Sequence, residues 1–540
     1  MFFLKNWIRF FWRRGAGVSG GLDEPSATGR YRLLAGRSQS PERDGGEIGR
    51  EATAIYRRPA SEIGSQSQGN SIWSLERDRK SGDSANVARL AQEADSHESR
   101  RQRQEIESWP SADGERLESP ADAVLIRRCG IAAGIAEVLA AVRGAKTVLL
   151  MAPPGSGKTT RVPPALMAAI AADQEVVVLE PRRLAARAAA QRVAQEVGAE
   201  LGGLVGYQVR GESRVSKETR VRFVTEGVLV RQMVQDPFLE GVGAVCLDEF
   251  HERHLEGDLA LAMLNEARST VREDLLLCVM SATLDPGPLQ RYLQGAEVVE
   301  ADGRLHPVAV EHLKRSTSDD LEVIVRGGVE RALDETDGDV LVFLPGVGEI
   351  SRAQKALGNL ASRLGVDVLP LHGRLDLREQ TRAIKPSDRR KVVLSTNVAE
   401  SSLTIAGVTA VVDSGLAREL RFDRGRSVDV LEKTRISLAS ATQRAGRAGR
   451  TGPGRCYRLW TAAEERGMRP HSLPDVQRVD LCGPALTVRA FAGRDPVAFG
   501  WFEAPPEDAL RGADQLLEAL GAIGGDDGKL TRFGEQLLAM

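Results

Sequence analysis

One stretch of the sequence has the residue types of a phosphate-binding loop, Ala152-Pro-Pro-Gly-Ser-Gly-Lys158-Thr159. Small residues let successive backbone amides curl around phosphate groups, Lys158 reaches the β- and γ-phosphates, and the Thr159 hydroxyl holds Mg²⁺. Such loops ordinarily begin with glycine, so Ala152 requires that its own backbone not be left-handed. The residues expected to bind the nucleotide are Gly155, Ser156, Gly157, Lys158, Thr159 and Thr160. The alternative is a glycine-rich turn without a ligand.

Two carboxylates and a histidine, in Asp248-Glu-Phe-His251, directly follow an apolar run at 242–247. Acidic residues at the carboxyl end of a parallel strand, beside a phosphate loop, lie where α/β sheets bind ligands. We expect Asp248 to hold Mg²⁺ and Glu249 to orient or deprotonate the attacking water. His251 and His254 are three residues apart, whereas a zincin helix needs four, which argues against zinc. A solvated loop is the alternative.

Three arginines recur at every third position in Gln443-Arg-Ala-Gly-Arg-Ala-Gly-Arg450. This run is expected to begin a helix, on which Arg444, Arg447 and Arg450 would form one cationic face. Arg447 and Arg450 could then contact a γ-phosphate as arginine fingers, and each such finger raises the rate ~10³-fold or more. A basic patch that binds RNA is the alternative.

The elements that must position these residues follow from apolar runs that alternate with helical ones. Strands that are apolar on both faces predict parallel sheets covered by helices, so the fold class is α/β. After the phosphate loop we expect a helix over 160–172, with Pro163 and Pro164 in its first turn. We expect two similar sheets in tandem. The expected strands are 147–151, 175–179, 221–224, 242–247 and 275–280, then 308–313, 339–344, 366–369, 391–394, 409–412 and 454–459.

Two further patterns lie toward the C-terminus. Residues 411–431 alternate enough for a β-hairpin, with an extended loop as the alternative. Residues 474–492 and 505–523 are expected to be helical, and 524–528 to form a turn before a short strand. The sequence ends inside an apparent helix at Met540, which favours a missing continuation.

Length and composition limit the number of domains, the class of protein and the kinds of site that the chain can form. A chain of 540 residues predicts about three domains, and 42% hydrophobic with 27% charged residues is typical of a globular protein. The net charge of −2 means that any nucleic acid must bind in a local basic channel. Five scattered cysteines argue against a zinc ribbon or disulfide framework and favour a reducing cytoplasm. No apolar run is long enough to span a membrane.

The first 120 residues differ in composition from the rest. Residues 1–16 mix aromatic and basic types, which suits a helix on a membrane surface, or they are spurious sequence upstream of the true start. Residues 17–120 are rich in Ser, Gly, Arg, Glu and Asp and are expected to be disordered.

Eight motifs in order resemble the helicase set of superfamily 2, and the form Asp-Glu-x-His251 resembles its DEAH/RHA family. Besides the three already described, the motifs are Glu180-Pro-Arg-Arg-Leu-Ala-Ala186, Thr225-Glu-Gly227, Ser281-Ala-Thr283, Phe343-Leu-Pro-Gly346 and Ser395-Thr-Asn-Val-Ala-Glu-Ser-Ser-Leu-Thr404. The variants Asp-Glu-Phe-His-Glu-Arg253 and Leu344-Pro-Gly-Val-Gly-Glu-Ile350 are most similar to a bacterial branch of that family.

The resemblance implies two RecA-like domains, 121–302 and 303–465, that close on ATP, or another NTP, and Mg²⁺ at their interface. A winged-helix-like segment and a truncated helical domain would follow at 466–540. The implied catalytic set is Lys158, Asp248, Glu249, His251, Gln443, Arg447 and Arg450. The implied contacts to the nucleic-acid backbone are Arg182, Arg183, Thr225, Gly346, Thr396 and Asn397. Such contacts predict weak sequence preference and strong salt dependence.

The family resemblance leaves three assignments open. Arg192 stacks on the nucleobase or is a solvated helix residue. Ser281 and Thr283 link the γ-phosphate region to the interdomain cleft or only pack in the core. The resemblance assigns the hairpin expected at 411–431 to strand separation, with an ordinary extended loop as the alternative.

The resemblance implies an ATP-dependent enzyme that translocates 3′ to 5′ on nucleic acid and unwinds it, with single-stranded RNA favoured over DNA, and we expect it in the cytoplasm. The alternative is a truncated nucleic-acid-binding protein that hydrolyses NTP or interacts with partners but does not unwind.

Overall fold

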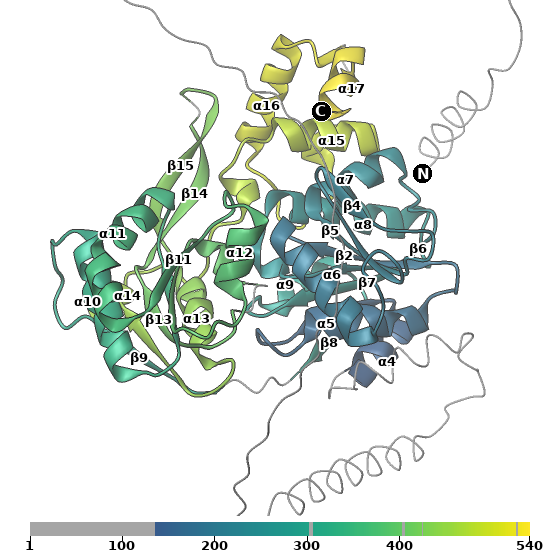
Figure 1. Cartoon of the computed structure of the whole chain (residues 1–540). Helices are drawn as coiled ribbons and strands as arrows, with labels where there is room; N and C mark the ends of the chain where they lie inside the picture. The colour runs from purple at the N-terminus through teal and green to yellow at the C-terminus, as the bar shows by residue number, and fades with distance from the viewer. Residues whose placement is uncertain (1–134, 302–305, 402–404, 424, 525–527, 540) are drawn as a thin grey trace, which may run out of the picture. The chain divides into compact units, whose positions relative to one another are not determined.

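The structure is a computed structural model that describes residues 135–301, 306–401, 405–423, 425–524 and 528–539 (Figure 1). The surface helix expected at 1–16 and the extension expected up to residue 120 lie outside these ranges. No helix in the described ranges has the length and apolar character needed to cross a bilayer.

The first sheet has eight strands in the order β4-β3-β5-β2-β6-β7-β1-β8, and every neighbouring pair is parallel except β3 with β4. Its central strands are rich in Val and Leu and are buried on both faces, as parallel strands between helices must be. The strands are β1 Thr147–Met151, β2 Glu175–Glu180, β3 Val205–Val209, β4 Glu212–Arg214, β5 Val221–Thr225, β6 Val242–Leu247, β7 Leu276–Ser281 and β8 Glu297–Glu300. The five strands predicted for this sheet are confirmed within a residue. Short, polar-flanked β3, β4 and β8 were not predicted.

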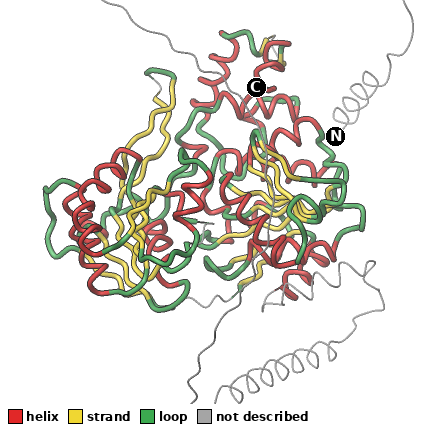
Figure 2. The backbone as a smooth tube through the Cα atoms, viewed as in Figure 1, coloured by secondary structure: helices red, strands yellow, loops and turns green. Residues whose placement is uncertain are grey.

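Helices cover both faces of this sheet (Figure 2). One hydrophobic cluster lies under α4, α5 and α6, and another lies under α7 and α8. The helices are α4 Ile135–Ala145, α5 Lys158–Leu166, α6 Arg183–Val197, α7 Glu226–Gln235, α8 Leu255–Thr270 and α9 Pro286–Tyr292. We call this sheet with these helices lobe 1.

The predicted position of the two prolines in the helix after the phosphate loop is wrong. Helix α5 begins at Lys158, because the end of the loop itself forms its first turn, so Pro163 and Pro164 lie in the second turn. A proline there has no N–H for the carbonyl four residues earlier, and α5 ends after nine residues at Leu166, well before residue 172.

The second sheet has six parallel strands in the order β11-β12-β10-β13-β16-β9. All six were predicted within two residues. They are β9 Val308–His312, β10 Asp339–Phe343, β11 Asp367–Leu371, β12 Lys391–Ser395, β13 Val408–Asp413 and β16 Gly454–Arg458. The helices around them are α10 Leu321–Glu335, α11 Val347–Leu364, α12 Leu377–Ile384, α13 Leu438–Gly446 and α14 Ala462–Glu465. We call this second group lobe 2.

An antiparallel hairpin of β14 Leu416–Asp423 and β15 Val428–Arg435 extends from lobe 2 (Figure 1). It confirms the predicted hairpin, but it starts later than residue 411 because β13 occupies 408–413 in the parallel sheet. We call β14 with β15 the hairpin.

The C-terminal segment packs against lobe 1. It contains α15 Cys482–Ala492, α16 Glu507–Ala519, a two-stranded ribbon of β17 Ile523–Gly524 and β18 Lys529–Leu530, and α17 Arg532–Ala539. Its apolar residues, including Leu486, Trp501 and Leu510, belong to the same hydrophobic cluster as α7 and α8. The helix predicted from residue 474 is wrong in its first half, where only Asp475–Gln477 forms a short 3₁₀ turn.

Candidate nucleotide site

The phosphate loop joins β1 to α5 and has the backbone that such a loop needs. Gly155 and Gly157 have φ of 85° and 89°, a region that favours glycine. Ala152 is not among the positive-φ residues, and its amide continues the sheet ladder by donating to the Ser281 carbonyl at 3.0 Å. The condition placed on Ala152 by the sequence is therefore met.

The lysine and threonine of the loop contact both carboxylates that follow β6. Lys158 Nζ lies 3.3 Å from Glu249 Oε2 and 3.9 Å from Asp248 Oδ1. The Thr159 hydroxyl donates to Asp248 Oδ2. The fold thus brings together, from two neighbouring strand ends, the side chains expected to handle phosphate, metal and water.

Burial controls the charges in this cluster. It raises the pKa of Asp248, an effect that nearby Lys158 partly offsets. It also opposes ionisation of Glu249, but the cations Lys158 and Arg447 outweigh burial and lower the pKa of Glu249. Burial opposes the charge of Lys158 too, yet the two carboxylates raise its pKa. Glu249 is therefore ionised and Lys158 protonated at neutral pH.

His251 connects the carboxylates to the Ser-Ala-Thr motif after β7. The Ala282 amide donates to His251 Nδ1 at 3.4 Å, which makes that nitrogen an acceptor. Burial lowers the pKa of His251, so the ring is neutral. Its Nδ1 also lies 3.6 Å from Glu249 Oε2.

Two contacts join the lobes beside this cluster. Gln443 Nε2 on α13 donates to the Thr283 hydroxyl at 3.4 Å. Arg182, just before α6, donates to the Ser401 hydroxyl of lobe 2. Ser281, the partner of Thr283 in its motif, is buried and accepts from the Leu284 amide at 3.2 Å.

Arg447 and Arg450 come from lobe 2 and are both sensitive to the charge of Glu249. Burial lowers the pKa of both guanidinium groups, that of Arg450 to about 10, and Glu249 opposes the decrease. Arg447 also donates to the Glu400 carbonyl. The structure therefore places these two arginines toward the carboxylate of lobe 1.

The prediction that Arg444 shares a cationic face with them is wrong. The motif ends a helix instead of beginning one, since α13 stops at Gly446 and a 3₁₀ turn follows. Arg444 is buried inside lobe 2, with Asp413 Oδ1 at 3.0 Å, Glu400 Oε2 at 2.8 Å and the Phe343 ring beneath it. The carboxylates neutralise its charge, so it forms no part of a surface patch.

The residues predicted to contact nucleic acid are in varied environments. Arg183 and Asn397 are exposed, whereas Thr225 and Thr396 are half-buried at helix N-caps. Gly346 is buried, and a Cβ there would lie 2.8 Å from Arg418 Nε. These placements leave their role a prediction.

Arg182 and Arg192 already have partners. The guanidinium of Arg182 forms an ion pair with Glu252 at 2.7 Å. Arg192 lies exposed on α6 and pairs with Glu196 at 2.6 Å, one turn away. This ion pair is compatible both with stacking of Arg192 on a nucleobase and with a solvated helix residue.

His254 and the two glutamates that it contacts, Glu226 and Glu252, were not predicted as site residues. His254 lies 3.2 Å from Glu252 and 3.4 Å from Glu226, which belongs to the Thr225-Glu-Gly227 motif. Burial opposes its protonation, but these two glutamates raise the pKa of His254 to about 9. The sequence held the residues within two recognised motifs, yet nothing in it indicated that they meet.

Glu180, at the end of β2, was also missed as a site residue. Its side chain is fully buried, and neither carboxylate oxygen has a hydrogen-bond partner among the residues that the structure describes. Burial and the nearby Asp248 and Glu249 raise its pKa well above the usual value. A neutral acid at this place would avoid a third negative charge beside the pair.

The donor set fits a magnesium nucleotide. Ser156 Oγ is buried in the phosphate loop without a partner among the described residues, so a polar group remains available there for a phosphate oxygen. Thr159 and Asp248 supply the hydroxyl and carboxylate that Mg²⁺ takes beside phosphates. Within the described ranges no group of three or more His, Cys, Asp or Glu could hold a metal by itself.

The two lobes match known protein families. The DEAD/DEAH box helicase family matches residues 134–291, and the helicase conserved C-terminal domain matches residues 321–452. The ATP-dependent RNA helicase HrpB of Escherichia coli is 43% identical over 414 residues, which cover 76% of this chain and 51% of that protein. A probable ATP-dependent RNA helicase DHX35 homolog of Caenorhabditis elegans is 36% identical over 396 residues, covering 70% of this chain and 54% of that protein.

A solved structure is similar as well. The crystal structure of the Escherichia coli DEAH/RHA helicase HrpB matches with a TM-score of 0.70 at 43% identity, covering 75% of this chain and 52% of the solved chain. These matches confirm the resemblance found in the motifs and the two RecA-like domains that it implied. The chain spans about half the length of the curated relatives HrpB and the DHX35 homolog.

Proposed function

Because this chain belongs to the DEAD/DEAH-box helicases of the DEAH/RHA type, we propose that it is an ATP-dependent RNA helicase that moves 3′ to 5′ and uses Mg²⁺. The observation that carries the proposal is that Lys158 lies 3.3 Å from Glu249 and 3.9 Å from Asp248 in lobe 1. Arg447 and Arg450 of lobe 2 lie near enough to Glu249 for their charges to interact with its carboxylate. A site divided in this way is complete only when the lobes are closed, so closure and hydrolysis are coupled.

The residues of the site divide the work of phosphoryl transfer to water. Bound Mg²⁺ supplies charge neutralisation at the phosphates. In the structure, Lys158 is held by Glu249, and its flexible side chain can exchange that carboxylate for phosphate oxygens. Glu249 then loses the neighbour that most lowers its pKa and becomes a stronger base for the attacking water. Arg447 and Arg450 stabilise the charge that develops on the transferred group.

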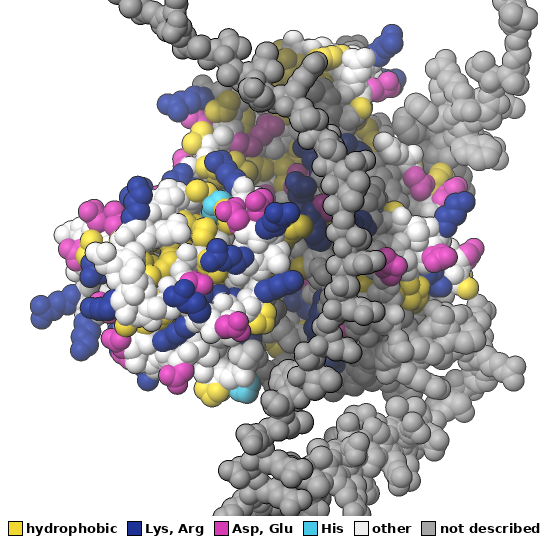
Figure 3. Space-filling view, in the orientation of Figure 1, with side chains coloured by type: hydrophobic (Ala, Val, Ile, Leu, Met, Phe, Trp, Pro, Cys, Tyr) yellow, Lys and Arg dark blue, Asp and Glu magenta, His cyan; other side chains and the backbone are white. Residues whose placement is uncertain are grey.

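RNA is favoured as the partner because HrpB and the DHX35 homolog are both named RNA helicases. Lys and Arg side chains are interspersed with Asp and Glu over the face of lobe 2 in Figure 3, which fits local phosphate contacts better than one large field. The single-stranded contacts proposed are Arg182, Arg183, Thr225, Gly346, Thr396 and Asn397. A cytoplasmic location is part of the same proposal.

The domain limits 121–302, 303–465 and 466–540 also remain proposals. The first of them is supported by the strand order, since β8 ends at Glu300 and belongs to the first sheet, whereas β9 begins at Val308 and belongs to the second. The winged-helix-like character of the last part rests on α15 to α17 with the β17–β18 ribbon between them.

Three assays with the full chain test the function. ATP hydrolysis is measured alone, with single-stranded RNA and with single-stranded DNA, and stimulation by RNA alone is expected. Unwinding is measured on duplexes with a 3′ or a 5′ tail, and only the 3′-tailed duplex should be separated. Equal stimulation by DNA would contradict the preference for RNA. Hydrolysis without unwinding would favour the binding-protein alternative, and loss of both activities would contradict the enzyme.

A further inference from the structure

We propose that residues 475–480, the linking segment, attach the hairpin to the turn that carries the catalytic carboxylates, so that the nucleotide site of lobe 1 positions a hairpin belonging to lobe 2. The proposal rests on the proposed function and adds residues that position the hairpin.

At one end, the linking segment is bonded to the turn after β6. The Asp475 amide donates to the Arg253 carbonyl at 3.0 Å, and Asp475 Oδ2 accepts from the Leu255 amide at 3.3 Å, at the N-terminus of α8. Arg253 is two residues beyond His251 and has a φ of 50°, so the turn is tightly constrained there. Movement of this turn therefore displaces Asp475.

The side chain of Arg253 holds the same turn against the C-terminal segment. Its guanidinium makes two bonds to Asp258, at 2.8 and 3.0 Å, and lies 3.0 Å from Glu503. It also stacks over the Phe502 ring at 4.6 Å from the ring centre. The turn is thus fixed by the Arg253 side chain to residues 502 and 503 of the C-terminal segment, in addition to its main-chain bond with the linking segment.

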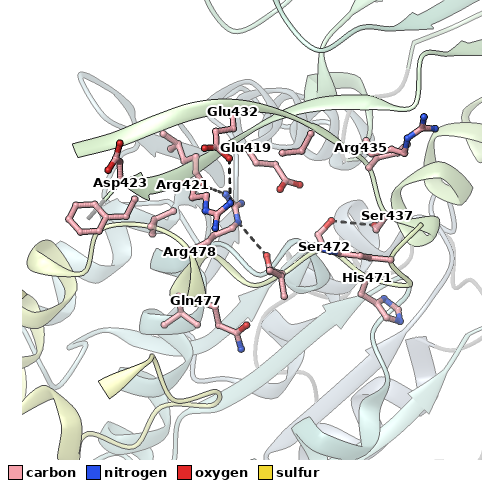
Figure 4. A pocket seen from close by; sticks show the side chains of 18 of the residues that line it. Glu419, Arg421, Asp423, Glu432, Arg435, Ser437, His471, Ser472, Gln477 and Arg478 are labelled. Carbon is pink, nitrogen blue, oxygen red and sulfur yellow. Dashed lines mark hydrogen bonds and ion pairs between the residues drawn. The ribbon is translucent and has the colours of Figure 1, made fainter. Parts of the chain in front are cut away.

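At its other end, the linking segment is bonded to the hairpin. The Phe422 amide donates to the Arg478 carbonyl at 2.7 Å, and the Arg478 guanidinium donates to the Leu420 carbonyl. The Asp480 amide donates to Asp429 Oδ1 on β15 at 3.1 Å. Figure 4 shows Arg478 pointing toward the strands of the hairpin. Both strands are therefore held by the segment.

One side chain spans the two ends of the linking segment. Arg478 also forms an ion pair with Asp475, whose other oxygen accepts from the Leu255 amide. The path from the catalytic turn to the hairpin therefore runs through two adjacent polar side chains, each with a defined partner on either side.

The base of the hairpin is anchored differently, to lobe 2. Arg418 lies 3.4 Å from Glu349 on α11, and Arg435 lies 3.2 Å from Glu464 on α14. Because the base is fixed to one lobe and the distal half to the other, relative movement of the lobes has to tilt or bend the hairpin. A cavity of about 900 Å³ between the hairpin and residues 467–479 leaves room for that movement (Figure 4).

Hydrogen exchange measured by mass spectrometry on the full chain tests the path. A non-hydrolysable ATP analogue with Mg²⁺ should slow exchange at residues 153–159 and also change exchange at residues 416–435. In Arg478→Ala the response at 153–159 should persist, whereas the response at 416–435 should fall at least threefold. Arg478→Lys keeps a cation beside Asp475 and should restore part of it. Arg511→Ala, which removes an exposed arginine of α16, is the matched control and should behave as wild type.

Unwinding gives the functional counterpart. We expect Arg478→Ala and Asp475→Asn to keep RNA-stimulated hydrolysis within about twofold of wild type and to separate at least tenfold fewer base pairs per ATP. An equal change of hydrogen exchange at residues 416–435 in wild type and Arg478→Ala would overturn the proposal. So would unchanged exchange at 416–435 when the analogue is added to wild type. Absence of any response at 153–159 in wild type would instead contradict nucleotide binding, and with it both the proposed function and this inference.

Discussion

The side-chain amide of Gln443 on lobe 2 donates to the hydroxyl of Thr283 on lobe 1, 3.4 Å away. Thr283 belongs to the same motif as Ala282, whose amide donates to His251 beside Asp248 and Glu249. This bond joins the two lobes beside the nucleotide site, and it supports the predicted role of Thr283 as a link between that site and the interdomain cleft.

We expect Gln443→Ala to lower the rate of RNA-stimulated ATP hydrolysis about fivefold, since one hydrogen bond contributes on the order of 1 kcal/mol. Thr283→Ala should have a similar effect. Because both variants remove the same bond, the double variant should be little worse than either single one. Steady-state hydrolysis across this double-mutant cycle measures the coupling, and strictly additive losses would contradict a functional contact.

Glu249→Gln should abolish hydrolysis while leaving nucleotide binding largely intact. The amide keeps the shape of the carboxylate but cannot accept the proton, and loss of a general base costs about 10²- to 10⁴-fold in rate. Single-turnover hydrolysis and binding of a fluorescent nucleotide measure the two properties. The control is Glu256→Gln, an exposed glutamate on α8, which should retain full activity. Turnover by Glu249→Gln at wild-type rate would remove the assignment of the base.

Lys158→Ala should instead weaken nucleotide binding itself. The variant loses the cation that reaches the phosphates and leaves Asp248 and Glu249 without their nearest positive partner. Titration with the fluorescent nucleotide is expected to show at least a tenfold rise in Kd, and an unchanged Kd would argue against a phosphate-binding role for this loop.

Arg444→Ala should destabilise lobe 2. Its removal leaves Asp413 as a buried carboxylate without its cation, a change that typically costs about 3–5 kcal/mol. Urea unfolding at neutral pH measures the loss of free energy, with the exposed Arg511→Ala as control, for which less than about 0.5 kcal/mol is expected. A loss for Arg444→Ala no larger than that of the control would contradict the inward, ion-paired position.

The raised pKa of His254 predicts a pH-dependent contribution to stability. The folded pKa of about 9 lies above the unfolded value, so the contribution is complete below about pH 6.5 and disappears as the pH rises through 9. Burial opposes the charge of His254, Glu226 and Glu252 favour it, and Arg182 opposes it. The ring is partly exposed, and we expect about 2 kcal/mol at pH 6 after allowance for solvent.

His254→Gln isolates this contribution. Urea unfolding should show a lower free energy of unfolding for the variant than for wild type at pH 6, and nearly equal values at pH 10. A difference of the same size at both pH values would mean that packing, and not charge, makes His254 important.

The sequence by itself determined the parts that depend on local pattern. The phosphate loop, the carboxylates after β6 and all eleven strands predicted for the two parallel sheets were located because side-chain periodicity and glycine content reflect short-range backbone geometry. The order of the motifs was sufficient to indicate two tandem domains. Where local pattern was ambiguous, as at 474–481, the prediction of a helix was wrong, because those backbone groups bond to the hairpin and to the turn after β6.

Only the tertiary structure decided which charged side chains lie close to one another. The spacing of Arg444, Arg447 and Arg450 is uniform in the sequence, yet Arg444 points into lobe 2 toward Asp413 and the other two lie near Glu249 of lobe 1. Arg182 and Ser401 are bonded although they are 219 positions apart. Pairing over such distances depends on how the sheets are packed and how far each group is buried. These are properties of the folded chain, and no local run of residues encodes them.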